Sequence, residues 1–169
     1  MLKVVGNAGK NSIIDFYNLY CNNISFKKNM HFSETTFERT LKHILRLPFQ
    51  HQYVVSKEIY EVSDACILAI TREFPAFTFF IVEDLFVENK GRNKERDDFF
   101  MMFLQWMVAR DATIVTNDKL RNYRTILKET KPIRVRRFQS GVVTEFNIDD
   151  IGETDFSQYR PDRVAFYFR

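Results

Sequence analysis

The stretch DDFFMMFLQWMVARDATIVTND, residues 97–118, decides the fold class of this chain. Two carboxylates, Asp97 and Asp98, open an apolar segment whose spacing predicts a helix over residues 97–109. A β-branched segment follows and predicts a buried strand over residues 112–116, which ends next to a third acid, Asp118. A helix that leads into a buried strand of this kind is typical of an α/β domain.

The same alternation of strands and helices continues on both sides of this stretch. It predicts a three-layer, Rossmann-like α/β domain, with a central parallel sheet of about five strands and helices on both faces. We place this domain in residues 1–139 and treat residues 140–169 as a C-terminal extension packed on or beside it. Three other helices are expected. The first begins at Ser33 and ends before Pro48, and the other two cover residues 60–74 and 119–129. The other expected strands are 12–15, 51–56, 76–82 and 133–138, with strand-like pieces at 142–146 and 164–168.

Composition limits the class of protein. The 169 residues are 45% hydrophobic and 28% charged, which argues against a disordered chain and allows one domain with a sizeable core. No apolar run approaches the roughly 20 residues of a membrane span, and the N-terminus lacks the apolar stretch of a secretory signal. Cys21 and Cys66 show no metal-ligand spacing and are expected as reduced thiols. We therefore expect an intracellular, cytoplasmic protein with no membrane partner.

Carboxylates stand at the ends of three expected strands, at Asp15, Asp84 and Asp118. The carboxyl ends of parallel strands meet at one edge of a sheet, and a helix that starts at Asp97 and Asp98 normally faces the same edge. Each acid has a structural explanation, as a helix cap, a partner of the helix dipole or a turn residue. Gathered at one edge, however, the acids would repel each other, and a divalent cation such as Mg²⁺ would offset that repulsion.

Three short motifs carry a resemblance to a known family. Residues 13–18 read Ile-Ile-Asp-Phe-Tyr-Asn, residues 97–100 read Asp-Asp-Phe-Phe, and residues 110–118 read Arg-Asp-Ala-Thr-Ile-Val-Thr-Asn-Asp. They resemble the opening strand with its Asp-x-x-Asn pattern, the Asp-Asp-Arg-Phe helix start and the Ser-Asp-Gly-Ile-Val-Val-Ser-Asn-Asp segment of the NYN branch of PIN-like nucleases. The Regnase-type ribonuclease domain is the most similar. The order of elements agrees over most of residues 10–138.

The resemblance implies a PIN-like domain and a metal-dependent endoribonuclease that hydrolyses RNA phosphodiester bonds to 5′-phosphate and 3′-hydroxyl ends. Carried over residue by residue, Asp15, Asp98 and Asp118 would hold Mg²⁺ or Mn²⁺. Asp97 would assist them, and Asn18 would orient Asp15 or bind a phosphate. The cation would lower the pKa of a bound water and offset charge on the transition state.

One departure from the family pattern keeps a second function open. The family has a further Asp four residues after the strand-end acid, and this chain has Asn122 there. An amide can hydrogen-bond a metal-bound water but adds no charge, and Asp84 is a candidate to replace the missing acid in part. The alternative is therefore a catalytically weak PIN-like module that binds RNA or a protein partner. A nuclease that acts on DNA is a third possibility, although the sequence contains no base-reading helix.

Basic residues concentrate in the middle of the chain. Residues 89–137 hold 13 Lys and Arg against 6 Asp and Glu, which favours a polyanionic partner. We expect single-stranded or stem-loop RNA at this surface, and a homodimer is compatible with the sequence. The alternative for these residues is a solvated loop and an exposed helix face. The candidate substrate-binding residues are Lys90, Arg92, Lys94, Arg96, Lys119, Arg121, Asn122 and Arg124.

Three further expectations concern side chains outside these motifs. Tyr17 and Tyr20 follow the first strand and could stack a base. Arg134 and Arg136 share one face of the strand at 133–138, so we expect an exposed basic edge there. The aromatic and Met side chains of the helix at 97–109 follow helical spacing and are expected in the core.

Overall fold

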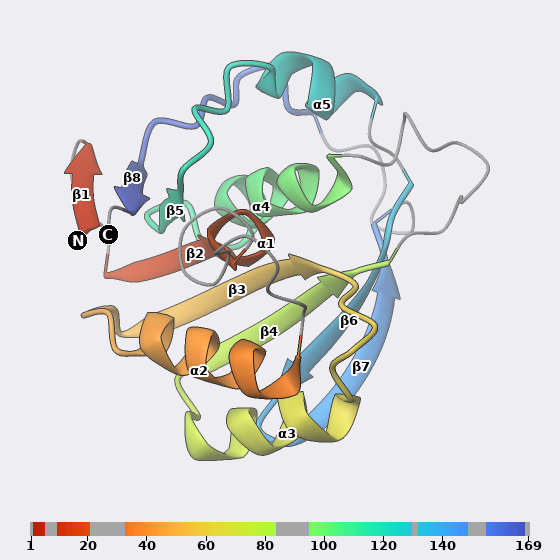
Figure 1. Cartoon of the computed structure of the whole chain (residues 1–169). Coiled ribbons are helices and arrows are strands. Elements are labelled where there is room, and N and C mark those ends of the chain that lie inside the picture. Colours follow the sequence, from red (N-terminus) through yellow and green to blue (C-terminus); the bar gives the residue numbers. More distant parts are fainter. Residues whose placement is uncertain are drawn as a thin grey trace.

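A mixed sheet of eight strands, with helices on both faces, forms the frame of the protein (Figure 1). The computed structural model describes residues 2–5, 10–20, 33–83, 95–129, 132–148 and 155–167. The strand order is β1-β8-β5-β2-β3-β4-β6-β7. The strands are β1 (Leu2–Val5), β2 (Asn11–Asp15), β3 (His51–Lys57), β4 (Phe77–Val82), β5 (Thr113–Thr116), β6 (Arg134–Gln139), β7 (Val142–Asn147) and β8 (Val164–Tyr167). The helices are α1 (Phe16–Leu19), α2 (Glu34–Leu45), α3 (Asp64–Glu73), α4 (Arg96–Met107) and α5 (Tyr123–Glu129).

The predicted α/β class is confirmed, but the sheet is mixed and has eight strands, whereas a parallel sheet of about five strands was predicted. The five adjacent strands β8, β5, β2, β3 and β4 run parallel to one another. The expected strand at 133–138 forms β6, which pairs antiparallel with β4, and β7 and β1 also pair antiparallel with their neighbours. Two strands from the segment 140–169, β7 and β8, belong to this same sheet.

A tight hairpin between β6 and β7 explains part of the antiparallel pairing. Ser140 and Gly141 both have positive φ, 50° and 78°, as expected for the two central residues of a type I′ turn. The Gly141 N–H donates to Thr71 Oγ1 on α3 at 2.8 Å. A Cβ atom at Gly141 would lie 2.5 Å from Arg72 Nε, so the turn packs closely on the helix. These contacts fix the end of the hairpin against α3.

The central strands are buried on both faces, and this separates the core into two layers. Consecutive side chains of a strand point to opposite faces, so Ile13 of β2 packs with α4 and α5, whereas Ile14 packs with α1, α2 and α3. All six residues of β4 are buried, as the apolar run at 76–82 predicts. Figure 1 shows α4 and α5 on one side of the sheet and α2 and α3 on the other.

Helix starts are set by local capping and backbone conformation. Ser33 Oγ accepts the Thr36 N–H at 3.2 Å, which confirms the expected start of α2. Ser63 Oγ accepts the Cys66 N–H at 3.2 Å, so α3 begins at Asp64 and not at residue 60. Leu120 has φ 53°, and α5 therefore begins at Tyr123 and not at residue 119. No helix in the described part of the chain is long and apolar enough to cross a membrane.

The order of the strands has a reversal point at the centre of the sheet. From β2 the chain moves to β3 and β4 on one side, and after α4 it returns to β5 on the other side of β2. Strand order therefore reverses between β2 and β5. In open α/β sheets, ligands bind outside the carboxyl ends of the strands at such a reversal. Asp15 ends β2 and Thr116 ends β5 at this point.

Candidate metal centre

Three carboxylates meet at the carboxyl end of β2. Asp15 is the last residue of β2, and Asp97 and Asp98 stand in the first turn of α4. One oxygen from each carboxylate lies within 4.8 Å of the others. Their exposed fractions are only 2%, 5% and 9%. The structure thus brings together acids from two segments that are far apart in sequence.

Burial and mutual repulsion disfavour the charged forms of these acids. Burial, followed by the charge of Asp97, raises the pKa of Asp15 to about 8. Burial, followed by the charge of Asp15, also raises the pKa of Asp98 well above its ordinary value. Burial raises the pKa of Asp97 to about 6, and the nearby Lys57 ammonium opposes this rise. Three buried carboxylates this close together are stabilised either by bound protons or by a bound cation, because both reduce the repulsion between them. Oxygen ligands at this spacing fit a hard divalent ion such as Mg²⁺ or Mn²⁺.

Thr116 connects this centre to β5, and its sequence motif gave no indication of that role. Its hydroxyl Oγ1 donates to Asp15 Oδ2 at 2.7 Å and accepts the Asp118 N–H at 3.0 Å. Thr116 is fully buried, so water does not compete for these bonds. The only sequence signal was a polar residue at the carboxyl end of a β-branched strand. Thr116 therefore orients the Asp15 carboxylate. Residues that hydrogen-bond metal ligands commonly have this role.

Asn18 also links the ends of β2 and β5. Its side-chain Oδ1 accepts the Asn117 N–H at 3.0 Å, and a hydrogen bond from its own backbone lowers the pKa of Asp15. The predicted contact between Asn18 and Asp15 therefore runs through the backbone, while the side chain fixes the start of the loop after β5.

Asp118 lies beside the three clustered acids and outside their close group. Its Oδ1 accepts the Leu120 N–H at 2.9 Å, in a turn where Leu120 has positive φ. Its charge nevertheless raises the pKa of Asp15 and of Asp98. Of the predicted ligand set, the structure thus gathers Asp15 and Asp98, with Asp97 as the third close carboxylate and Asp118 next to them.

Asn122, which stands where the resembled nucleases have an acid, lies against the carboxylate of Glu95. Its Nδ2 donates to Glu95 Oε1 at 2.6 Å. Glu95 directly precedes α4, and its charge raises the pKa of Asp97. The carboxylate of Glu95 therefore contacts the side-chain amide of Asn122. Asp84, the predicted partial replacement, lies outside the described residues.

The predicted basic residues divide into three groups. Arg96 is buried, and its Nη1 donates to the Pro132 carbonyl oxygen, so it helps to anchor α4. Arg124 is exposed, and its guanidinium lies over the Tyr123 ring at 5.7 Å from the centroid. Lys119 and Arg121 are also exposed, directly after Asp118. The predicted loop residues Lys90, Arg92 and Lys94 lie outside the described residues.

Lys57, at the end of β3, is a cation that the sequence motifs did not identify. Its Nζ lies 3.9 Å from Asp97 Oδ1 and 5.3 Å from the centroid of the Tyr17 ring. These residues border a pocket of about 200 Å³ that is also lined by Glu58, Tyr60, Glu83 and Arg96. Tyr17 is thus placed beside the centre.

The prediction that Tyr20 could stack a base is wrong. Tyr20 is 1% exposed, and its ring stacks on Phe16 with centroids 5.4 Å apart. Its place in the core leaves no face of the ring for a ligand.

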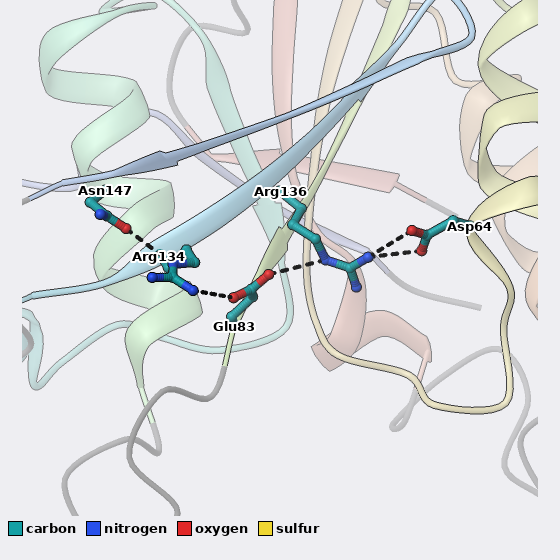
Figure 2. A network of polar contacts seen from close by, with 5 residues as sticks. All are labelled: Asp64, Glu83, Arg134, Arg136 and Asn147. Carbon is teal, nitrogen blue, oxygen red and sulfur yellow. Dashed lines mark hydrogen bonds and ion pairs between the residues drawn. The ribbon is translucent and has the colours of Figure 1, made fainter.

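The expectation of an exposed basic edge at β6 is also wrong. β6 lies between β4 and β7, and Arg134 and Arg136 are paired with acids (Figure 2). Arg136 Nη1 donates to both oxygens of Asp64 at 2.8 and 2.9 Å, and its Nε lies 3.3 Å from Glu83 Oε1. Arg134 lies 3.9 Å from Glu83 and donates to Asn147 at 3.4 Å. This network fixes Glu83 at the wall of the pocket.

The centre thus combines buried oxygen ligands, a hydroxyl that orients one of them, and a lysine at the rim of an adjacent pocket. A divalent ion at such carboxylates can activate water and offset charge on a phosphate. A scan of protein-family models, a search of curated proteins and a search of solved structures each found no match for this chain.

Proposed function

We propose that this chain is a metal-dependent endoribonuclease with a PIN-like domain. The observation that carries the proposal is the buried group of Asp15, Asp97 and Asp98 at the point where strand order reverses. Three buried acids within 4.8 Å of each other are costly for the fold unless a cation or protons offset their charge. The resemblance of the motifs around these acids to the NYN branch supports the same conclusion.

The residues of the chain have separate roles in this proposal. Asp15, Asp97 and Asp98 bind Mg²⁺ or Mn²⁺, and Thr116 orients Asp15 through the bond to Oδ2. The bound ion would supply a nucleophilic water near neutral pH and offset charge that develops on the phosphate during hydrolysis. Asp118, beside the group, would accept the proton from the attacking water or orient that water.

Support for RNA as the substrate comes from the surface after β5. Lys119, Arg121 and Arg124 are exposed there, next to Asp118. Lys and Arg beside a metal centre bind the nucleic-acid backbone and hold it in register. The local excess of basic residues between 89 and 137 agrees with a polyanionic substrate. The resemblance to Regnase-type domains favours RNA over DNA.

A cleavage assay tests this proposal. Purified protein is incubated with labelled single-stranded and hairpin RNA in Mn²⁺, in Mg²⁺ or in excess chelator, and with DNA strands of matched sequence. We expect cleavage of RNA that requires the cation and leaves 5′-phosphate ends. Cleavage in excess chelator would contradict a metal-dependent mechanism, and preferential cleavage of DNA would favour a deoxyribonuclease.

The second candidate function is a catalytically weak module that binds RNA or a protein. Asn122 favours it, because no carboxylate stands at this position. Binding of RNA without cleavage across several divalent ions would establish this alternative. The contact between Asn122 and Glu95 bears on the choice, since it brings another acid to the same place.

Substitution of Asn122 by Asp tests whether this position limits activity. We expect Asn122→Asp to give no gain in cleavage rate. Asn122 Nδ2 now donates to Glu95 Oε1 at 2.6 Å, and a carboxylate at position 122 would lose this bond and repel Glu95. Two negative charges in contact repel each other, so Tm should fall slightly at pH 8. Thermal melts and cleavage rates of both proteins measure this. A large rise in rate would show that the chain lacks an acid that Glu95 does not replace.

A further inference from the structure

We propose that the pocket beside the three acids binds the nucleotide next to the scissile phosphate, with Lys57 in contact with that phosphate. This inference rests on the proposed function and names a substrate subsite of the same centre. The pocket touches the centre directly, because Asp97 is both one of the three clustered carboxylates and part of the pocket wall.

The position of Lys57 is suited to a phosphate. Its Nζ is 3.9 Å from Asp97 Oδ1, at the outer limit of an ion pair, and its side chain is 35% exposed. The ammonium group of a lysine has three N–H donors and no acceptor, so it suits an anionic oxygen. A phosphate whose oxygen lies near the ion at Asp97 therefore comes within reach of Lys57, and such charge-assisted bonds are among the stronger ones in proteins.

Aromatic side chains give the pocket a surface for a base. Tyr17 and Tyr60 both line the pocket, and Tyr60 is 82% exposed. Single-stranded RNA is commonly held by bases stacked on such rings. The volume of about 200 Å³ lies below the range of roughly 300–1,000 Å³ that is typical for drug-sized ligands, so the pocket encloses only a small part of an oligonucleotide.

Charge determines how a nucleotide would lie in the pocket. Glu58 and Glu83 also line it, and Figure 2 shows Glu83 held by Arg134 and Arg136. These carboxylates repel a phosphate and accept hydrogen bonds from the hydroxyl groups of a ribose or the amino groups of a base. The phosphate is therefore assigned to the Lys57 and Asp97 side, and the sugar or base to the side of Glu58 and Glu83.

Binding of an RNA oligomer without cleavage tests this subsite. The probe is fluorescein-labelled octauridylate, and its affinity is measured by anisotropy with Ca²⁺ in place of Mn²⁺. We expect Lys57→Ala to weaken binding at least about tenfold, which corresponds to the loss of one hydrogen bond to a charged group. Lys57→Arg should recover part of the affinity, and Tyr17→Leu should weaken binding about fivefold or more.

Lys42→Ala is the matched control, because it removes the same charge from a partly exposed lysine on α2 that pairs with Glu38 and Glu73. We expect its affinity for the oligomer to stay unchanged. Unchanged affinity in Lys57→Ala, or an equal loss in Lys42→Ala, would overturn the inference. Melting curves of all variants, compared with Lys57→Gln, show whether a loss reflects the fold.

The outcome also separates this inference from the proposed function. In one result, the unmodified protein shows no RNA cleavage with any metal tested, while Lys57→Ala still weakens RNA binding. That result would support the subsite and contradict the nuclease. Metal-dependent cleavage with an unchanged KM and kcat in Lys57→Ala would support the nuclease and contradict the subsite.

Discussion

Asp15→Asn is expected to lower the rate of Mn²⁺-dependent RNA cleavage by at least about 100-fold. Loss of groups that merely orient metal ligands already costs about 10–100-fold, and Asp15 is itself one of the clustered acids. The amide keeps the size of the carboxylate and can still accept the bond from Thr116 Oγ1, so the geometry changes little. Initial rates at saturating Mn²⁺ for both proteins measure the effect.

The same variant separates loss of function from loss of fold. Asp15 is 2% exposed, and burial raises the pKa of its carboxyl, so a neutral amide suits the site without a cation. We expect Tm without metal at pH 8 to be unchanged or higher in Asp15→Asn. Asp111→Asn, at an exposed acid before β5, is the control and should keep full activity. Undiminished cleavage by Asp15→Asn would contradict the assigned site.

The stabilisation of the protein by Mn²⁺ is expected to grow as pH rises from about 5.5 to 8.5. The folded-state pKa of Asp15 is raised from 3.8 to about 8, and that of Asp98 is raised as well. A raised pKa contributes stability that is fully present below the unfolded value and is lost as pH rises through the folded value. The metal-free protein should therefore become less stable across this range, whereas cation binding requires the charged forms.

Thermal melts with and without Mn²⁺ measure this second effect. At a Mn²⁺ concentration 100-fold above Kd, binding contributes about 2.7 kcal/mol, or roughly 5–10 °C in Tm for a chain of this size. We expect a shift of this order at pH 8.5 and a much smaller one at pH 5.5. Asp15→Asn should show little pH dependence of the shift. An equal shift at both pH values would mean that Mn²⁺ binds elsewhere.

The sequence predicts the elements that position the centre because their signals are local. Apolar runs bounded by acids placed β2, β4, β5 and the start of α4 within a few residues. The meeting of Asp15 with Asp97 and Asp98 followed from the rule that parallel strand ends share one edge. That rule does not specify which oxygens approach most closely, and so it did not distinguish Asp97 from Asp118.

Features that depend on contacts between distant segments were beyond the reach of the sequence. β6 pairs antiparallel with β4, and the Ser140–Gly141 turn, which packs on α3, returns the chain along β6 as β7. Lys57 carries no motif, and only the neighbouring position of β3 brings it to Asp97. The bond between Asn122 and Glu95 likewise joins segments that no periodicity relates.

Direct titration of Mn²⁺ tests the central claim, that Asp15, Asp97 and Asp98 together bind one divalent ion. The measurement is calorimetry at pH 8 on the unmodified chain, on Asp98→Asn and on the exposed control Asp111→Asn. We expect one Mn²⁺ per chain in the unmodified protein and in Asp111→Asn, and a loss of affinity of at least about tenfold in Asp98→Asn. The same stoichiometry and affinity in Asp98→Asn would contradict the account.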